Sequence, residues 1–251
     1  MLTSKKWTMA LAAVFMAAPM AFAQFYPTAH DARPGAMGGC LFVPEKVRSV
    51  TLDYRQGWLL SGLADKSIAV VWPAGIGVVS VDYLHHGNRD YNEQQVSASY
   101  RIQATEWLEV GVGARYLFAG SSDILYQPEN YLAAEAVVET HWGRQTSAML
   151  YAKHRPWDEI HPFGAHLQFM HRPVNGLLSV VEVEMEQAFR AHAGMEYCYE
   201  ECYFVRAGFA TNPIVATFGV GVKMKSLSID LSTEVHSVLG ISPQTSIRLW
   251  F

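Results

Sequence analysis

Residues 227–236 read Leu-Ser-Ile-Asp-Leu-Ser-Thr-Glu-Val-His, so that apolar or β-branched residues alternate with polar ones. Side chains in a β-strand point to opposite faces in turn, which gives this segment one apolar face and one polar face. A helix would scatter the same residues around its axis. Ten residues is about the length that a tilted strand needs to cross the apolar layer of a membrane. The segment therefore predicts a membrane-spanning strand.

Similar alternation occurs in 214–224 and 188–197, and the polar face often carries full charges, as at Glu182, Glu184 and Glu186. A soluble β-sandwich also alternates, but its strands are usually nearer five or six residues. The longer segments favour a transmembrane antiparallel β-barrel over a sandwich. We count about fourteen of them, and an even number places both chain ends on the periplasmic side. A barrel of twelve strands is the alternative. The expected strands are 48–56, 66–73, 76–85, 94–103, 107–118, 131–142, 145–153, 163–170, 177–186, 188–198, 203–211, 214–224, 227–236 and 244–251.

Composition agrees with this class of protein. Only 17% of the 251 residues are charged, compared with about 25% in soluble domains. Mean hydropathy is nevertheless only +0.06, and no run of 18 apolar residues follows residue 24. The net charge of −4 gives no support for nucleic-acid binding.

The N-terminus has the features of an export signal. Lys5 and Lys6 precede an apolar run at 8–20, and 21–23 (Ala-Phe-Ala) supplies the small residues of a cleavage site. A membrane anchor is the alternative, but the run is shorter than the ~20 residues that a spanning helix needs. We expect 1–23 to be a cleaved signal peptide, 24–47 to be an N-terminal segment and 48–251 to be a barrel in the cell outer membrane, in contact with its lipid.

The N-terminal segment 24–47 is rich in proline and glycine and makes a poor strand. We expect it to act as a hatch inside the barrel; a disordered periplasmic tail is the alternative. The candidate hatch residues are Arg33, Met37, Gly38 and Gly39. The two glycines suit a turn with positive φ, and Arg33 is expected to pair with a carboxylate of the lumen such as Glu182 or Glu184.

Charged residues on the polar faces should point into the barrel. Their signs are mixed, whereas a strongly ion-selective pore would carry rings of one sign, so we expect them mainly to pair with one another. The candidates are Arg101, Arg115, Glu182, Glu184, Arg190, Glu196, Arg206, Asp230, Glu234 and Arg248.

Cys198 and Cys202 flank a short turn between two expected strands. A disulfide between them suits an oxidising compartment, and two free thiols are the alternative. Cys40 has no evident partner. The histidines lack ligand spacing and no catalytic motif is present, so we expect no enzymatic activity, no metal site and no cofactor.

The last expected strand ends in an aromatic residue. Ile247, Leu249 and Phe251 form its apolar row. A terminal aromatic on such a row resembles the signal by which barrel-assembly machinery recognises its clients, so this machinery is an expected partner.

Two stretches resemble a known family. Residues 32–40 (Ala-Arg-Pro-Gly-Ala-Met-Gly-Gly-Cys) are similar to a segment near the mature N-terminus of FadL-like outer-membrane proteins of the PorV/PorQ group. Residues 236–244, leading into 247–251, resemble the closing hairpin of that group. The resemblance implies a fourteen-stranded barrel with an N-terminal hatch.

The same resemblance implies an accessory role in type IX protein secretion or surface attachment, with secretion components or secreted cargo as partners. Relatives of FadL instead pass hydrophobic small molecules, and that passive-channel function is the alternative. A third possibility is a purely structural barrel.

Overall fold

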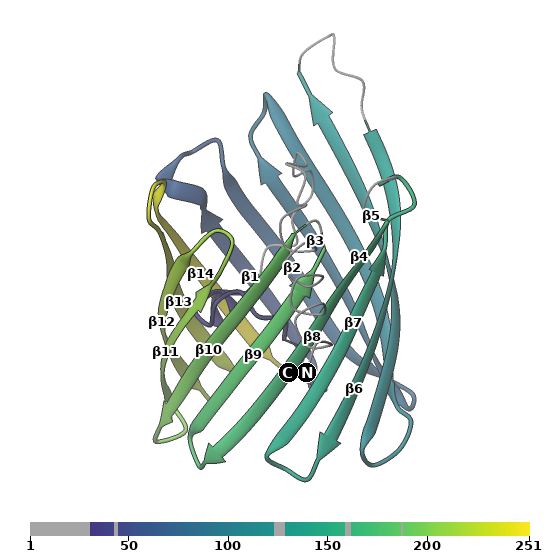
Figure 1. Ribbon diagram of the computed structural model, residues 1–251, viewed down its shortest axis with the longest axis vertical. Helices are drawn as coiled ribbons and strands as arrows, with labels where there is room; N and C mark the ends of the chain where they lie inside the picture. The colour runs from purple at the N-terminus through teal and green to yellow at the C-terminus, as the bar shows by residue number, and fades with distance from the viewer. Residues whose placement is uncertain (1–30, 43–44, 123–128, 159–161, 187) are drawn as a thin grey trace, which may run out of the picture.

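A computed structural model describes residues 31–42, 45–122, 129–158, 162–186 and 188–251. They form a closed antiparallel barrel of fourteen strands, each paired with its neighbours in the sequence (Figure 1). The fourteen-strand prediction is confirmed. The strands are β1 (Ser49–Gln56), β2 (Ala64–Ala74), β3 (Gly77–Gly87), β4 (Tyr91–Gln103), β5 (Leu108–Ser121), β6 (Glu129–Trp142), β7 (Thr146–His154), β8 (Phe163–Val174), β9 (Leu177–Met185), β10 (Phe189–Tyr199), β11 (Tyr203–Ala210), β12 (Val215–Met224), β13 (Leu227–His236) and β14 (Gly240–Trp250).

Pairing of β1 with β14 closes the barrel, from Ser49 opposite Trp250 to Arg55 opposite Gln244. β14 begins four residues earlier than the sequence predicts and includes Pro243. A proline lacks the N–H that a strand donates. Pro243 faces Thr233 of β13 but lies beyond the last residue of β14 that pairs with β1, which makes the missing donor tolerable.

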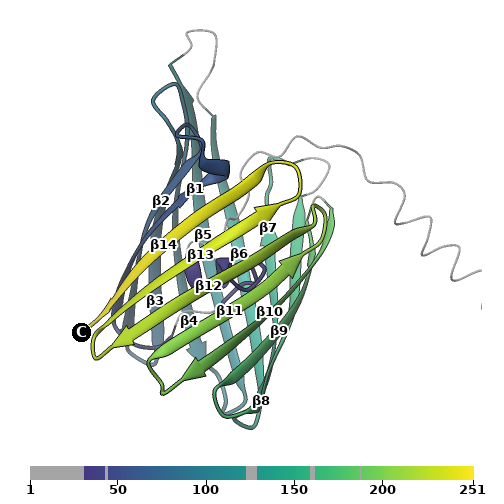
Figure 2. The ribbon, with the colours of Figure 1, turned by 90° about the vertical axis from the view of Figure 1, so that its left-hand side faces the viewer.

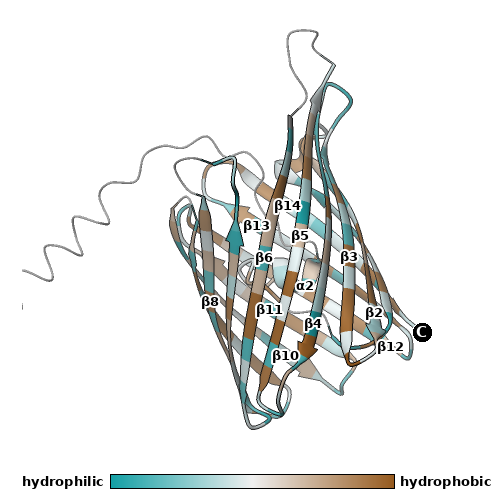
Figure 3. Ribbon diagram, turned by 90° about the vertical axis from the view of Figure 1, so that its right-hand side faces the viewer, coloured by the Kyte–Doolittle hydropathy of each residue, from teal (hydrophilic) through white to brown (hydrophobic). Residues whose placement is uncertain are grey.

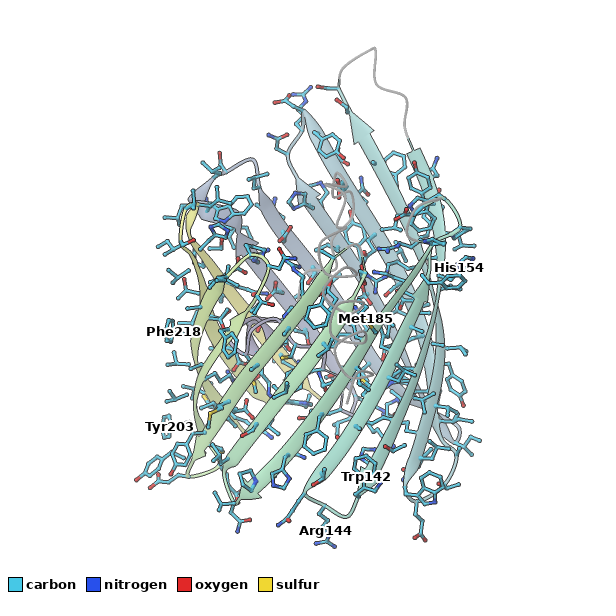
Figure 4. The ribbon with its side chains drawn as sticks, viewed as in Figure 1. Trp142, Arg144, His154, Met185, Tyr203 and Phe218 are labelled. Carbon is cyan, nitrogen blue, oxygen red and sulfur yellow. The ribbon has the colours of Figure 1, made fainter. Side chains whose placement is uncertain are left out.

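The two faces of the wall have opposite chemistry. Phe218 of β12 is 52% exposed and points away from the barrel (Figure 4), while Asp230 of β13 is only 7% exposed. Hydrophobic residues alternate with polar ones along the strands (Figure 3). An apolar exterior around a polar interior is the pattern of a barrel surrounded by lipid. The protein is an outer-membrane barrel.

Aromatic side chains lie near one rim of the barrel. Trp142 and Tyr203 are exposed and lie near the lower rim in Figure 4, Trp142 close to the turn that carries Arg144 and Tyr203 at the left-hand side. Rings with one polar edge favour the membrane–water interface, so this rim lies at a membrane surface. Within the described residues, no helix has the length and apolar character needed to span a membrane.

The C-terminus lies at the same rim as the short turns (Figure 2). Here the amide of Phe251 donates to the carbonyl of Arg48 over 3.2 Å, so the start of the barrel and its end are joined. At the opposite rim, the β1–β2 connection contains the short helix η1 (Gly57–Leu59).

Residues 31–42 lie inside the barrel rather than in its wall. They begin with one turn of helix, α2 (Ala32–Gly35), which lies against β12, β13 and β14 (Figure 3). We refer to residues 31–42 as the hatch. The expected signal peptide, and residues 24–30 and 43–44 of the expected N-terminal segment 24–47, lie outside the described residues.

Candidate functional site: the hatch and the chambers beside it

The hatch starts at an anchored aspartate. The Asp31 side chain accepts a hydrogen bond from the amide of Arg33 over 3.0 Å and so caps α2. Ser246 of β14 donates its hydroxyl to Asp31 over 2.9 Å, and the Arg248 guanidinium forms an ion pair with the same carboxylate. The sequence analysis overlooked Asp31, although it predicted that Arg248 points inward.

Arg33 joins a chain of buried charges. Its guanidinium donates to both carboxylate oxygens of Glu196, over 2.8 and 2.7 Å. Arg206 donates to Glu196 over 2.6 Å and to Asp230 over 2.5 Å. Burial lowers the pKa of Arg33, but Glu196 outweighs this effect and the pKa is raised. Cations and anions therefore alternate in one row, from Arg33 of the hatch through Glu196 of β10 and Arg206 of β11 to Asp230 of β13.

Arg33 pairs with a carboxylate of the lumen, as expected, but this carboxylate is Glu196 rather than Glu182 or Glu184. Glu182 and Glu184 also point inward, but on β9, which faces a later part of the hatch. Glu196 on β10 lies where α2 brings Arg33. Charge alone did not distinguish these carboxylates because all of them occupy the polar face of a strand.

Three inward-facing glycines make room for the hatch. A Cβ added at Gly194 would lie 2.6 Å from that of Met37, and one at Gly219 would lie 2.5 Å from that of Ala36. A Cβ at Gly208 would overlap the hatch backbone at Gly38. Gly194 and Gly208 are direct partners across β10 and β11. The wall is therefore shaped to let the hatch backbone approach closely.

The hatch turns at Gly38 and Gly39, both with φ of +77°, the conformation expected for them. The amide of Gly38 donates to the Thr217 hydroxyl over 2.9 Å, and Thr217 donates onward to the carbonyl of Ala36 over 2.9 Å. His192 donates from Nδ1 to the carbonyl of Gly38 over 2.7 Å. Wall side chains thus satisfy a turn that has few partners of its own.

Beyond the turn the hatch contacts β8 and β9. The amide of Leu41 donates to Glu182 over 2.7 Å, and the Gln168 amide donates to the carbonyl of Leu41. His166 Nδ1 lies 2.8 Å from the other oxygen of Glu182. The backbone of Leu41 is therefore bonded on both sides to a polar cluster of the wall.

A small apolar cluster lies beneath this contact. Met37 and Cys40 have 0% exposure and contact Leu178 and Val180, with Phe42 and Met170 at the edge. Burial raises the pKa of the Cys40 thiol, and Glu182 adds to the shift. Cys40 is therefore a protonated, inert thiol while the hatch is docked.

Two chambers lie beside the hatch. The loop-side chamber, of about 470 Å³, includes Trp58, Leu239 and Gly39 in its lining. The terminus-side chamber, of about 300 Å³, includes Phe42 and Trp250. The hatch thus contributes to the lining of both chambers, and Leu41 and His166 are shared between them.

His166, Glu184 and Glu186 have ligand atoms within 4.8 Å of one another and could in principle hold a metal ion. Their carboxylates already have partners, since Lys153 lies 2.8 Å from Glu186 and His192 lies 3.0 Å from Glu184. A metal ion would have to displace these groups. The cluster therefore suits an ion-pair network better than a metal centre.

The remaining lumen charges mainly pair with one another, as expected. Arg101 pairs with Glu109 over 2.9 Å, Arg115 with Glu135 over 2.5 Å, and Arg55 with Glu234 over 3.1 Å. Arg190 lies near a rim, where it donates to the carbonyl of Asn212.

Cys198 and Cys202 are free thiols, so the structure does not contain the expected disulfide. Cys198 pairs across the hairpin with Phe204, and Tyr199 pairs with Tyr203. Cys202 therefore lies in the turn and does not face Cys198. Ile247, Leu249 and Phe251 are all exposed on the outer face, as an assembly signal would require.

Sequence reasoning missed Thr217, His192, Gln168 and the three wall glycines. One available signal was the occurrence of glycine at inward positions of three successive strands, β10 to β12, where a polar or charged residue is usual.

The sequence matches no known family model and no curated protein. The fold, however, is similar to solved structures. The toluene transporter TbuX of Ralstonia pickettii aligns with a TM-score of 0.68 at 11% identity over 88% of this chain and 98% of its own. The toluene transporter TodX of Pseudomonas putida aligns with a TM-score of 0.66 at 10% identity, over 89% and 97%.

The outer membrane protein Omp33 of Acinetobacter baumannii aligns with a TM-score of 0.57 at 9% identity, over 82% of this chain and 99% of its own. TbuX and TodX are described as toluene transporters, and none of these three neighbours is described as an enzyme. At these identities the similarity establishes the fold alone.

Proposed function

We propose that this barrel is a hatch-gated passive channel for small, mainly apolar molecules in the outer membrane. The observation that carries the proposal is the pair of chambers beside the hatch, both lined by Leu41 and His166. A solute would have to pass this point to cross the lumen. Passage therefore requires only a local displacement of the hatch.

The chamber sizes suit small solutes. A cavity of about 150 Å³ is sufficient for benzene. Volumes of about 470 and 300 Å³ accommodate a substituted ring but exclude most folded or polymeric cargo.

The hatch supplies an apolar surface at the dividing point. Leu41, Cys40 and Phe42 border the terminus-side chamber, and the Phe42 ring lies 5.3 Å from the Arg33 guanidinium. Polar wall residues face this surface. The fold similarity to TbuX and TodX, described as toluene transporters, supports the same class of solute.

Substitutions of Leu41 test the proposal. Leu41→Ala should speed the uptake of toluene across the outer membrane of whole cells, relative to cells that lack the barrel, because it widens the dividing point. Leu41→Trp should slow entry, because it narrows that point. The same two substitutions at Leu60, which is exposed in the β1–β2 connection, are the matched controls. Equal entry through all four variants and the wild type would refute the gate.

An accessory role in type IX secretion is the second candidate. The observation that favours it is the resemblance of residues 32–40, which form most of the hatch, to the PorV/PorQ group. Its test is affinity purification from detergent-solubilised outer membranes. Recovery of secretion components would support it, and purification of the barrel without them would count against it.

A further inference from the structure

The terminus-side chamber has two unlike kinds of lining. Phe42 and Leu41 of the hatch, together with Met149 and Tyr151 of β7, provide aromatic and apolar surface. The lining that β3, β4 and β5 contribute, on the same stretch of wall as β7, is polar. Its residues include Ser80, Asp82, Ser97, Ser99 and Arg115.

Strand register arranges the polar lining as two adjacent rows. Asp82 lies opposite Ser97, which lies opposite Arg115 on the next strand. Ser80 lies opposite Ser99 in the row beside it. Ser80 and Asp82 are two residues apart on β3 and therefore point to the same face. The register thus places hydroxyl and carboxylate side chains on neighbouring residues of the chamber lining.

Three polar atoms of these rows lack a hydrogen-bond partner in the described part of the chain, and one of them, Nε of Arg115, has Glu135 as an ion-pair partner at 2.5 Å; the other two have none. These two are the hydroxyl oxygen of Ser80 and Oδ2 of Asp82, while Oδ1 of Asp82 accepts from Ser97. Buried polar atoms without a partner are rare because each costs free energy. Both lie in residues that line the chamber, so small side-chain rotations would let an occupant supply the missing bonds.

We propose that the terminus-side chamber binds a monocyclic aromatic molecule that carries a hydroxyl group, of the phenol class. The proposal rests on the channel function proposed above and specifies its solute. A hydroxyl group both donates and accepts hydrogen bonds. It can donate to the Asp82 carboxylate and accept from the Ser80 hydroxyl, while an ammonium group can only donate.

The remainder of the chamber suits the ring. Phe42 and Tyr151 offer aromatic surfaces, and Met149 offers a thioether that contacts rings favourably. The volume of about 300 Å³ exceeds the roughly 150 Å³ that holds benzene and leaves space for substituents.

Binding of 4-methylphenol and toluene to the purified full-length protein in detergent tests the inference, since the two differ only in the hydroxyl group. Micelles without protein correct for partitioning. We expect 4-methylphenol to bind about tenfold or more tightly than toluene, as one hydrogen bond to a charged group predicts. Asp82→Asn should reduce this ratio by about threefold or more, and Asp82→Ala combined with Ser80→Ala should bring it near one.

Ser232→Ala is the matched control, because Ser232 is an inward serine that lines the loop-side chamber instead. Its binding ratio should equal that of the wild type. Heat-dependent migration on a gel verifies that each variant is folded.

Equal binding of both compounds by the wild type, or a ratio that the Asp82 and Ser80 substitutions leave unchanged, would overturn the inference. Tighter binding of 4-methylbenzylammonium than of 4-methylphenol would replace the hydroxyl assignment with recognition of a cation. Faster uptake of both compounds by cells that carry the barrel than by cells that lack it, in spite of equal binding, would leave the channel intact. Equal uptake by the two kinds of cell would refute the channel itself.

Discussion

Gly194→Ala should release the hatch while leaving the barrel closed. The added methyl would lie 2.6 Å from the Cβ of Met37, 0.8 Å closer than the 3.4 Å at which ordinary contact begins. The hatch must therefore move by nearly 1 Å. Gly38, the residue after Met37, makes two hydrogen bonds to the wall: its amide donates to Thr217 over 2.9 Å, and its carbonyl accepts from His192 over 2.7 Å. A shift of this size would stretch both beyond hydrogen-bonding range.

Two neutral hydrogen bonds contribute about 2 kcal/mol, so the population of undocked hatch should rise about 30-fold. Alkylation of Cys40 reports this population, because the thiol has no exposure in the docked state. The assay uses a background in which Cys198 and Cys202 are replaced by serine, so that Cys40 alone reacts.

Gly120→Ala is the control, since Gly120 lies on β5 and its added methyl would contact only the ring of Phe118. It should leave the alkylation rate unchanged. Equal rates for Gly194→Ala and the wild type would refute the close docking of the hatch on β10.

Three further outcomes are expected. Glu196→Gln should raise the rate of Cys40 alkylation by more than tenfold, and by more than Arg33→Gln does. Loss of the Glu196 charge leaves Arg33 and Arg206 without their shared anion, whereas loss of the Arg33 charge leaves Glu196 paired with Arg206. Equal effects of the two substitutions would contradict the shared ion pair. Burial raises the pKa of Cys40, so the docked hatch keeps this thiol protonated. Above about pH 8.5, where a free thiol ionises, the equilibrium constant for docking should fall about tenfold per pH unit, measured as the rate of proteolysis of the hatch. Cys40→Ala should abolish this pH dependence, and a dependence that persists would assign it to another group. A reducing agent should leave the unfolding temperature unchanged, because Cys198 and Cys202 are free, and a clear drop would reveal a disulfide.

The barrel was predictable because its signal is local and repeated. Alternation within 227–236 defines the faces of β13 without knowledge of any other strand, and the same holds along the chain. Strand ends were less certain. β14 can extend back to Gly240 because, at Pro243, it is paired with β13 but no longer with β1. This depends on the register between β1 and β14, which the sequence does not reveal.

The contacts of the hatch could not be predicted in the same way. Glu182, Glu184 and Glu196 are equivalent in sequence terms, since each is a carboxylate on a polar face. Which of them meets Arg33 depends on where a short helix lies inside a closed barrel. The expected disulfide failed for a similar reason, because hairpin register places Cys202 in the turn.

Conductance across a planar lipid bilayer tests the central claim most directly, namely that the hatch closes an otherwise open barrel. The intact protein should show little conductance, and a variant lacking residues 31–42 should show large, stable open channels, because a fourteen-stranded barrel is too wide for its wall side chains to fill. A large conductance in the intact protein, or none in the shortened one, would contradict the account.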